Sequence, residues 1–158
     1  MLDRTAEQFD LAPSRVVADA GYGSAEMLGW LVDERGIEPH VKVFDKSERL
    51  DGTLSRSDFA FDAERDLYVC PEGEELKRNH QTFSTPRDGV RKDGTIGYRA
   101  SKFDCETCPL KSKCCPNAVA RRIARSIYEA ARDKARAIAK TAAYVAESER
   151  RSRCCLRI

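Results

Sequence analysis

Long hydrophobic runs and histidines are scarce in this 158-residue sequence. No stretch of about 18 apolar residues is present, so we expect no membrane-spanning helix. The N-terminus, Met1-Leu2-Asp3-Arg4, continues directly into charged sequence, which excludes a secretory signal peptide and points to the cytoplasm. The sequence also lacks GxGxxG, Walker A, HExxH and nucleophile-elbow motifs, which argues against dinucleotide-binding, P-loop, zinc-protease and Ser/His/Asp hydrolase classes.

A large excess of charge of one sign is lacking too, because 28 Lys and Arg residues face 26 Asp and Glu residues. The distribution is uneven, since residues 121–153 hold ten basic against four acidic side chains. Alanine-rich sequence with apolar residues at three- and four-residue steps predicts a helix from about Arg122 to Glu149, within a basic segment 121–151. Basic side chains there favour contact with DNA phosphates. The expected DNA-binding residues are Arg121, Arg122, Arg125, Arg132, Arg136 and Lys140.

The alternative for this basic segment is a solvated helix face without a nucleic-acid partner. Glu129 and Asp133 lie at the spacing that allows local ion pairs with neighbouring arginines on a helix. The composition alone leaves both readings open.

Residues 1–45 predict a small α/β core in the order helix, strand, helix, strand. The second helix is expected to begin after Ser24, a good N-cap, and to end at Gly36, in the position of a C′ glycine. Short apolar runs at 15–19 and 41–44 predict the strands, and the short connections imply a parallel pair.

Asp19 is the candidate catalytic residue, because it follows the first predicted strand at the sheet edge where ligands gather in open α/β folds. A carboxylate here, followed by glycines, is a plausible ligand for Mg²⁺, which takes one or two carboxylates and keeps several waters. The alternative is an Asp that caps the turn by accepting a backbone hydrogen bond.

Residues 46–120 are polar and carry five of the seven cysteines, which indicates an inserted subdomain with short strands. One CxxC with further cysteines can supply four thiolates for a structural zinc ion, and a small apolar-poor subdomain gains folding free energy from such a metal. The expected zinc ligands are Cys70, Cys105, Cys108 and Cys114. The alternatives are unliganded buried thiols and a site that has lost its metal.

Taken in order, these elements resemble the DDE transposases of bacterial insertion sequences, in particular the subgroup with a Cys-rich insertion after the second acid. The resemblance covers about residues 1–150. It rests on Ala18-Asp19-Ala20-Gly21-Tyr22-Gly23-Ser24, Leu31 with Gly36-Ile37, Phe44-Asp45-Lys46, Tyr68-Val69-Cys70-Pro71, Tyr98-Arg99, Cys105-Glu106-Thr107-Cys108-Pro109-Leu110 and the Arg-rich segment through Tyr144.

The resemblance implies a ribonuclease H-like fold and makes Asp19 the second acid of an Asp-Asp-Glu triad. In that family the triad holds two divalent ions, normally Mg²⁺, that promote in-line attack of water or a DNA 3′-hydroxyl on a phosphodiester. The implied partners are the ends of the insertion sequence and target DNA, with an oligomer as the active form. The fold class expected is therefore α/β, a ribonuclease H-like fragment with a small Cys-rich β insertion and a long C-terminal helix.

Two acids of the triad are missing from the sequence. The first is expected on a strand before Met1, and the third in a Val-Glu-x-x-Phe pattern after the basic segment, where Glu147 and Glu149 come too early. One choice of codons for Arg151–Ile158 reads Val-Glu-Met-Leu-Phe-Ala-His in a shifted frame. We therefore expect residues 152–158 to be an out-of-frame tail, and the fragment to be inactive alone.

Two other functions stay open at this point: a zinc-stapled DNA- or protein-binding module without catalysis, and an incompletely folded remnant. If strands before residue 1 are absent, the strand at 15–19 has an unpaired edge, from which we expect poor solubility.

Overall fold

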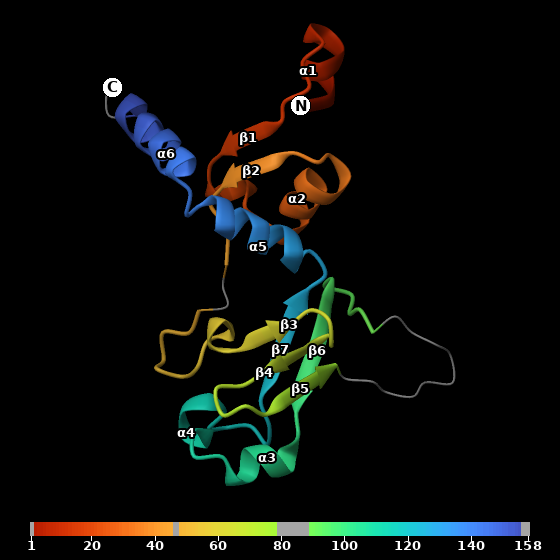
Figure 1. The fold of residues 1–158 in the computed structure, drawn as a ribbon, viewed down its shortest axis with the longest axis vertical. Coiled ribbons are helices and arrows are strands. Elements are labelled where there is room, and N and C mark those ends of the chain that lie inside the picture. The colour runs from red at the N-terminus through yellow and green to blue at the C-terminus, as the bar shows by residue number, and fades with distance from the viewer. Residues whose placement is uncertain (1, 46–47, 79–88, 156–158) are drawn as a thin grey trace. The chain divides into compact units, whose positions relative to one another are not determined.

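The computed structural model describes residues 2–45, 48–78 and 89–155, with only the backbone given for 151–155, and it divides into two compact units. Unit 1 consists of Met1–Phe44 together with Tyr128–Ile158, and unit 2 is Asp45–Ile127. Unit 2 is thus inserted in the chain between two segments of unit 1 (Figure 1). Across the described ranges, no helix combines the length and the apolar character needed to cross a membrane.

Unit 1 is a mixed helix and strand unit built on one parallel strand pair. Strand β1 (Arg15–Ala18) pairs with β2 (Glu38–Val41), which confirms the predicted parallel arrangement. The connection contains α2 (Ala25–Gly29) and a π-helical turn (Trp30–Glu34), and the remaining helices are α1 (Leu2–Phe9), α5 (Glu129–Ile138) and α6 (Ala142–Cys155).

Local signals explain the boundaries of the connection between β1 and β2. The hydroxyl of Ser24 accepts the backbone N–H of Met27 at 3.2 Å and so caps α2. Gly36 has φ +64°, the left-handed conformation that ends a helix and favours glycine. The core between α2, α5 and the sheet consists of Leu28, Val41, Ala131 and Ala135, and the two alanines allow close packing of α5.

Two sequence predictions for secondary structure are wrong. The second strand of unit 1 was expected at 41–44, and it lies at Glu38–Val41. The basic helix does not start at Arg122, because Arg122–Ser126 is strand β7 and the helix begins only at Glu129. The apolar positions fit both periods over this short stretch, and pairing with β6 selected the strand.

The C-terminal helical segment is also interrupted between α5 and α6. Thr141 stands at this break: its hydroxyl donates to the carbonyl of Ile138 at 2.7 Å and accepts the N–H of Tyr144 at 3.3 Å. A side chain that replaces backbone partners in this way ends one helix and caps the next.

Unit 2 is a five-stranded antiparallel sheet in the order β3-β4-β5-β6-β7. Its strands are β3 (Ala60–Asp62), β4 (Leu67–Val69), β5 (Glu75–Arg78), β6 (Thr95–Ala100) and β7 (Arg122–Ser126), and two short helices, α3 (Lys102–Thr107) and α4 (Lys111–Cys114), follow β6. Short strands were expected within residues 46–120, and β3, β4, β5 and β6 lie there.

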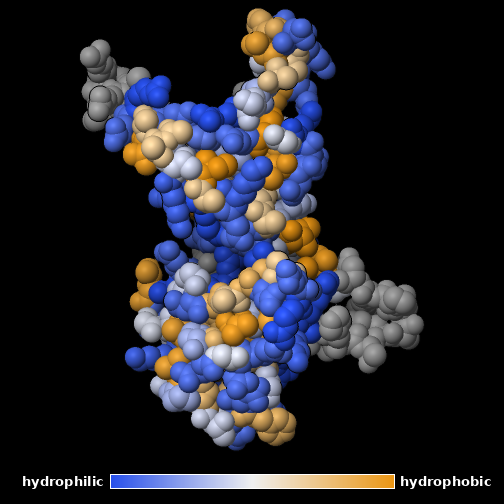
Figure 2. All heavy atoms as spheres, in the orientation of Figure 1, coloured by the Kyte–Doolittle hydropathy of each residue, from blue (hydrophilic) through white to orange (hydrophobic). Residues whose placement is uncertain are grey.

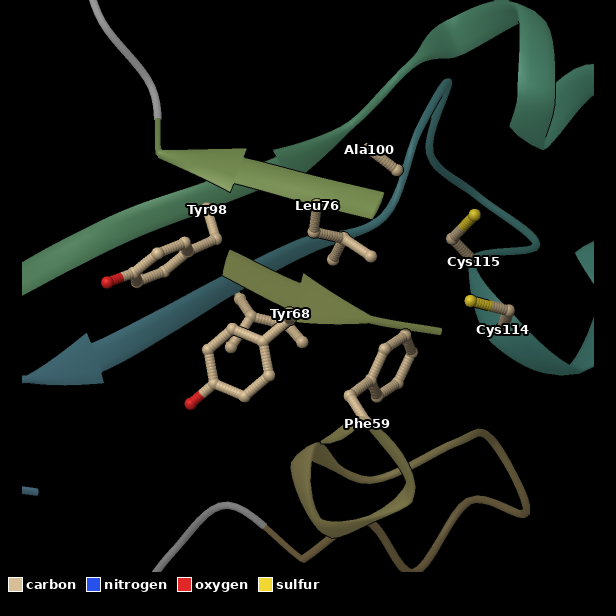
Figure 3. Packing of buried hydrophobic residues seen from close by; sticks show 8 residues of the cluster. Phe59, Tyr68, Leu76, Tyr98, Ala100, Cys114 and Cys115 are labelled. Atoms are coloured by element: carbon tan, nitrogen blue, oxygen red, sulfur yellow. The ribbon is translucent and has the colours of Figure 1, made fainter. Parts of the chain in front are cut away.

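One face of this sheet packs on an apolar cluster that includes Phe59, Tyr68, Leu76, Tyr98 and Ile123 (Figure 3). The rings of Tyr68 and Tyr98 meet edge to face, with centroids 5.2 Å apart. The hydroxyl of Tyr98 donates to Asp66 at 2.5 Å, and burial together with this bond raises the pKa of Tyr98. We call this side of the sheet the core face and the opposite side the open face.

Candidate functional site

Asp19 directly follows β1, at the carboxyl end of the parallel pair. Its carboxylate accepts the backbone N–H of Gly21 at 2.8 Å and caps the short 3-10 turn Ala20–Tyr22. Asp19 is exposed to solvent. The capping role considered from the sequence is therefore present, and the carboxylate is also accessible from outside.

The described residues contain no group of three or more His, Cys, Asp or Glu side chains arranged to hold a metal ion. Asp19 therefore has no pair of neighbouring acids in this part of the chain. A single carboxylate does not hold two divalent ions, so the described residues do not by themselves complete a two-metal site.

The arginines expected to contact DNA are divided between the two units. Arg121 is buried, and its guanidinium donates to the carbonyls of Cys114 and Leu54, both at 2.8 Å. Arg125 stacks over the ring of Phe61 at 3.7 Å from the centroid. Both side chains stabilise unit 2 from within, on the core face of the sheet.

In unit 1, Arg132 and Arg136 both bind the carboxylate of Glu129. The distances are 3.0 Å from Arg132 and 2.9 Å from Arg136, and Glu129 is only 1% exposed. This confirms the local pairing on α5 that the spacing suggested. Of the six expected DNA-binding residues, Arg122 and Lys140 are the two that are exposed.

Four of the five cysteines of unit 2 contact the same apolar cluster. Cys114 and Cys115 are buried in the apolar cluster (Figure 3). Cys70 and Cys105 pack against this cluster. Cys108 is half-buried at the C-terminus of α3. The side chains of Cys154 and Cys155, in the expected out-of-frame tail, lie outside the described part of the structure.

The surroundings of these thiols differ. The Cys70 sulfur accepts the backbone N–H of Glu74 at 3.3 Å, in the turn between β4 and β5. Burial, and after it the neighbouring thiol of Cys115, raises the pKa of Cys114 to about 11. Arg121 acts in the opposite direction through its positive charge. Cys114 is therefore a neutral thiol at neutral pH unless a cation binds beside it.

A row of cations on the open face of unit 2 was missed by the sequence analysis. Lys77 on β5 stands opposite Arg99 on β6, which in turn stands opposite Arg122 on β7. All three residues are exposed. Only the strand register brings these three residues together. In the sequence, the charged residues within the short runs 75–78 and 95–100 are the only indication of such a row.

The arrangement offers the exposed carboxylate of Asp19, several thiols that contact one apolar cluster, and a cationic sheet face. Hydrophilic residues cover much of the visible surface of each unit (Figure 2). Compared with known proteins, the chain matches no family model, no curated protein and no solved structure.

Proposed function

We propose that the chain is part of a DDE-type DNA transposase, in which unit 1 belongs to a ribonuclease H-like catalytic domain and unit 2 is an insertion. The supporting observation is the discontinuity of unit 1 along the chain. The chain leaves unit 1 after Phe44, shortly after β2, forms the Cys-rich sheet unit, and returns at Tyr128 to form α5. An α/β unit interrupted at this point follows the order of elements that the family resemblance implies.

In this proposal Asp19 is a ligand of Mg²⁺ and the second acid of the triad. Bound Mg²⁺ would supply the charge that activates the attacking hydroxyl and stabilises the leaving oxygen. The chain's own contribution is to hold the Asp19 carboxylate at the end of β1, fixed by the N–H of Gly21. Without two more acids the chain is inactive alone. Its partners are the DNA ends of the mobile element and target DNA, in the cytoplasm, with an oligomer as the active form.

The decisive test is the DNA that encodes and flanks the chain, translated in all three frames. We expect an Asp-bearing strand upstream and a Val-Glu-x-x-Phe pattern in a shifted frame across Arg151–Ile158. A protein with the frame restored should cleave labelled element-end DNA in Mg²⁺, and its Asp19→Asn variant should not. Flanking DNA unrelated to either pattern would contradict the proposal.

A second candidate is a zinc-stapled binding module without catalysis. The observation that favours it is the gathering of thiols in unit 2, together with the backbone N–H that points at the Cys70 sulfur. Thiolates suit zinc, and metal binding would add folding free energy to a unit with a small core. The proposed ligands are Cys70, Cys105, Cys108 and Cys114, and binding would have to draw these thiols closer together than the described structure has them.

The zinc proposal is tested on the full chain purified without chelator. We expect about one zinc per chain by elemental analysis and a lower melting temperature after chelation. Cys108→Ser should lose the metal, whereas Cys115→Ser, the matched control at the neighbouring buried thiol, should retain it. Metal-free protein whose melting temperature does not respond to added zinc would contradict the proposal.

A further inference from the structure

The open face of unit 2 concentrates positive charge across three adjacent strands. Lys77, Arg99 and Arg122 are directly opposite one another in the β5–β6 and β6–β7 ladders, so their side chains project from the same face. Arg91 joins them, because its guanidinium lies against Gly97. A Cβ at position 97 would overlap with this guanidinium. Gly97 alternates with the core residue Tyr98, which places Arg91 on the open face.

The described acids offset part of this charge, because Asp93 interacts electrostatically with Arg91. Glu75 lies 3.2 Å from Lys77 and also pairs with Arg65. Arg91, Arg99 and Arg122 form no ion pair with any described acidic side chain. Like charges directly opposite in a ladder destabilise a sheet, so this row has an intrinsic cost that a bound polyanion would remove.

We propose that the open face of unit 2, through Lys77, Arg91, Arg99 and Arg122, binds the phosphate backbone of duplex DNA. Neighbouring strands are roughly 5 Å apart and alternate residues roughly 7 Å apart, so the four cations cover about 10 by 7 Å before their side chains extend. Duplex DNA presents one phosphate charge per about 1.7 Å of axis, so several phosphates fit this area.

The position of the aromatic residues favours a duplex over a single strand. Proteins that bind single strands stack the bases on aromatic side chains beside a basic groove. The aromatic residues on the described strands are Phe61, Tyr68 and Tyr98, and they lie together on the core face. The open face therefore offers charge without stacking platforms, as sequence-independent backbone contact requires. The choice of DNA as the ligand rests on the proposed function. The presence of the cationic face is independent of that function.

The test is binding of a short fluorescein-labelled DNA duplex to the full chain, followed by fluorescence anisotropy between about 50 and 200 mM salt. Arg99→Gln/Arg122→Gln should weaken binding by about tenfold or more and reduce the slope of log affinity against log salt by about 2. The matched control is Arg4→Gln/Lys134→Gln, which removes the same charge from two exposed positions of unit 1. It should change the affinity less than about twofold, because neither residue belongs to the proposed surface, and an exposed charge outside it is screened by salt.

Arg99→Lys/Arg122→Lys should retain most of the binding, since phosphate contact requires charge rather than a particular side chain. Circular dichroism should be the same for all variants. Equal losses in the two glutamine pairs, no binding by the parent chain at low salt, or tighter binding of an RNA duplex of the same sequence would each overturn the inference. The transposase proposal is tested separately, by the encoding DNA and by the Asp19→Asn variant of the protein with its frame restored.

Discussion

Nδ1 of His40 lies 2.6 Å from Oε2 of Glu147, and both atoms are buried. The contact joins β2 to α6. Arg15 of β1 binds the other carboxylate oxygen of Glu147 at 3.2 Å, and Tyr144 lies beside the His40 ring with centroids 5.8 Å apart. Glu147 thus contacts both strands of unit 1 from α6.

Acid should loosen this attachment of α6. Burial pushes the pKa of Glu147 upward, but the close contact with His40, together with Arg15, outweighs it and holds that pKa below the ordinary value of 4.5. A lowered carboxyl pKa means that the contribution to stability is present above about 4.5 and is lost as pH falls through the lowered value. The other charged group at His40 is Glu38, 3.8 Å from Nε2.

We therefore expect NMR contacts between the rings of His40 and Tyr144 to persist at neutral pH and to disappear below the ordinary pKa of a glutamate. Glu147→Gln should weaken them at neutral pH and remove their dependence on acid in this range. Contacts that persist in the Gln variant at every pH would contradict this role of Glu147.

The buried carboxylate of Glu129 should be important for the stability of unit 1. Glu129→Gln removes the carboxylate that lies 3.0 Å from Arg132, which is 8% exposed, and breaking a buried pair in this way costs about 3 kcal/mol. The control Asp133→Asn removes an exposed carboxylate 2.5 Å from Arg136 and should cost less than about 1 kcal/mol. Urea unfolding followed by the fluorescence of Trp30, the only tryptophan, reports unit 1. Equal costs for the two variants would contradict the prediction.

Gly29→Ala should destabilise unit 1, although alanine is normally the better helix former by about 1 kcal/mol. A Cβ at Gly29 would overlap with the ring of Tyr128, and overpacking of this kind costs about 1–3 kcal/mol. In a Tyr128→Ala background the same substitution should become stabilising, because the obstacle is gone. The change in the free energy of unfolding caused by Gly29→Ala, measured with urea, should therefore reverse its sign between the two backgrounds. This reversal distinguishes steric overlap from a general need for glycine.

Arg99→Glu should stabilise unit 2 while abolishing binding to DNA. The glutamate would stand opposite Lys77 and Arg122, and it would replace two repulsive cross-strand pairs by two attractive ones, worth about 0.2–1 kcal/mol each. Thermal unfolding followed by circular dichroism should show a higher melting temperature than for Arg99→Gln, the neutral control. A lower melting temperature for the glutamate variant would show that the cations do not repel one another.

Several features of the fold follow from local sequence. The cap at Ser24 and the glycine at Gly36 set the limits of the connection between β1 and β2, because each acts through its own backbone and nearest neighbours. The parallel pairing of β1 with β2 follows from their short helical connection. The turn after β1 likewise follows from local sequence, because Asp19 caps it by accepting the N–H of Gly21.

Tertiary structure decided what the basic residues do. Residues 122–126 fit a helix by spacing, yet pairing with β6 makes them a strand, because hydrogen bonds to a neighbouring strand outweigh weak helix propensity over a short stretch. That choice turns Arg125 to the core face and Arg122 to the open face. The row from Lys77 through Arg99 to Arg122 depends on register between strands distant in sequence, and no local pattern encodes it.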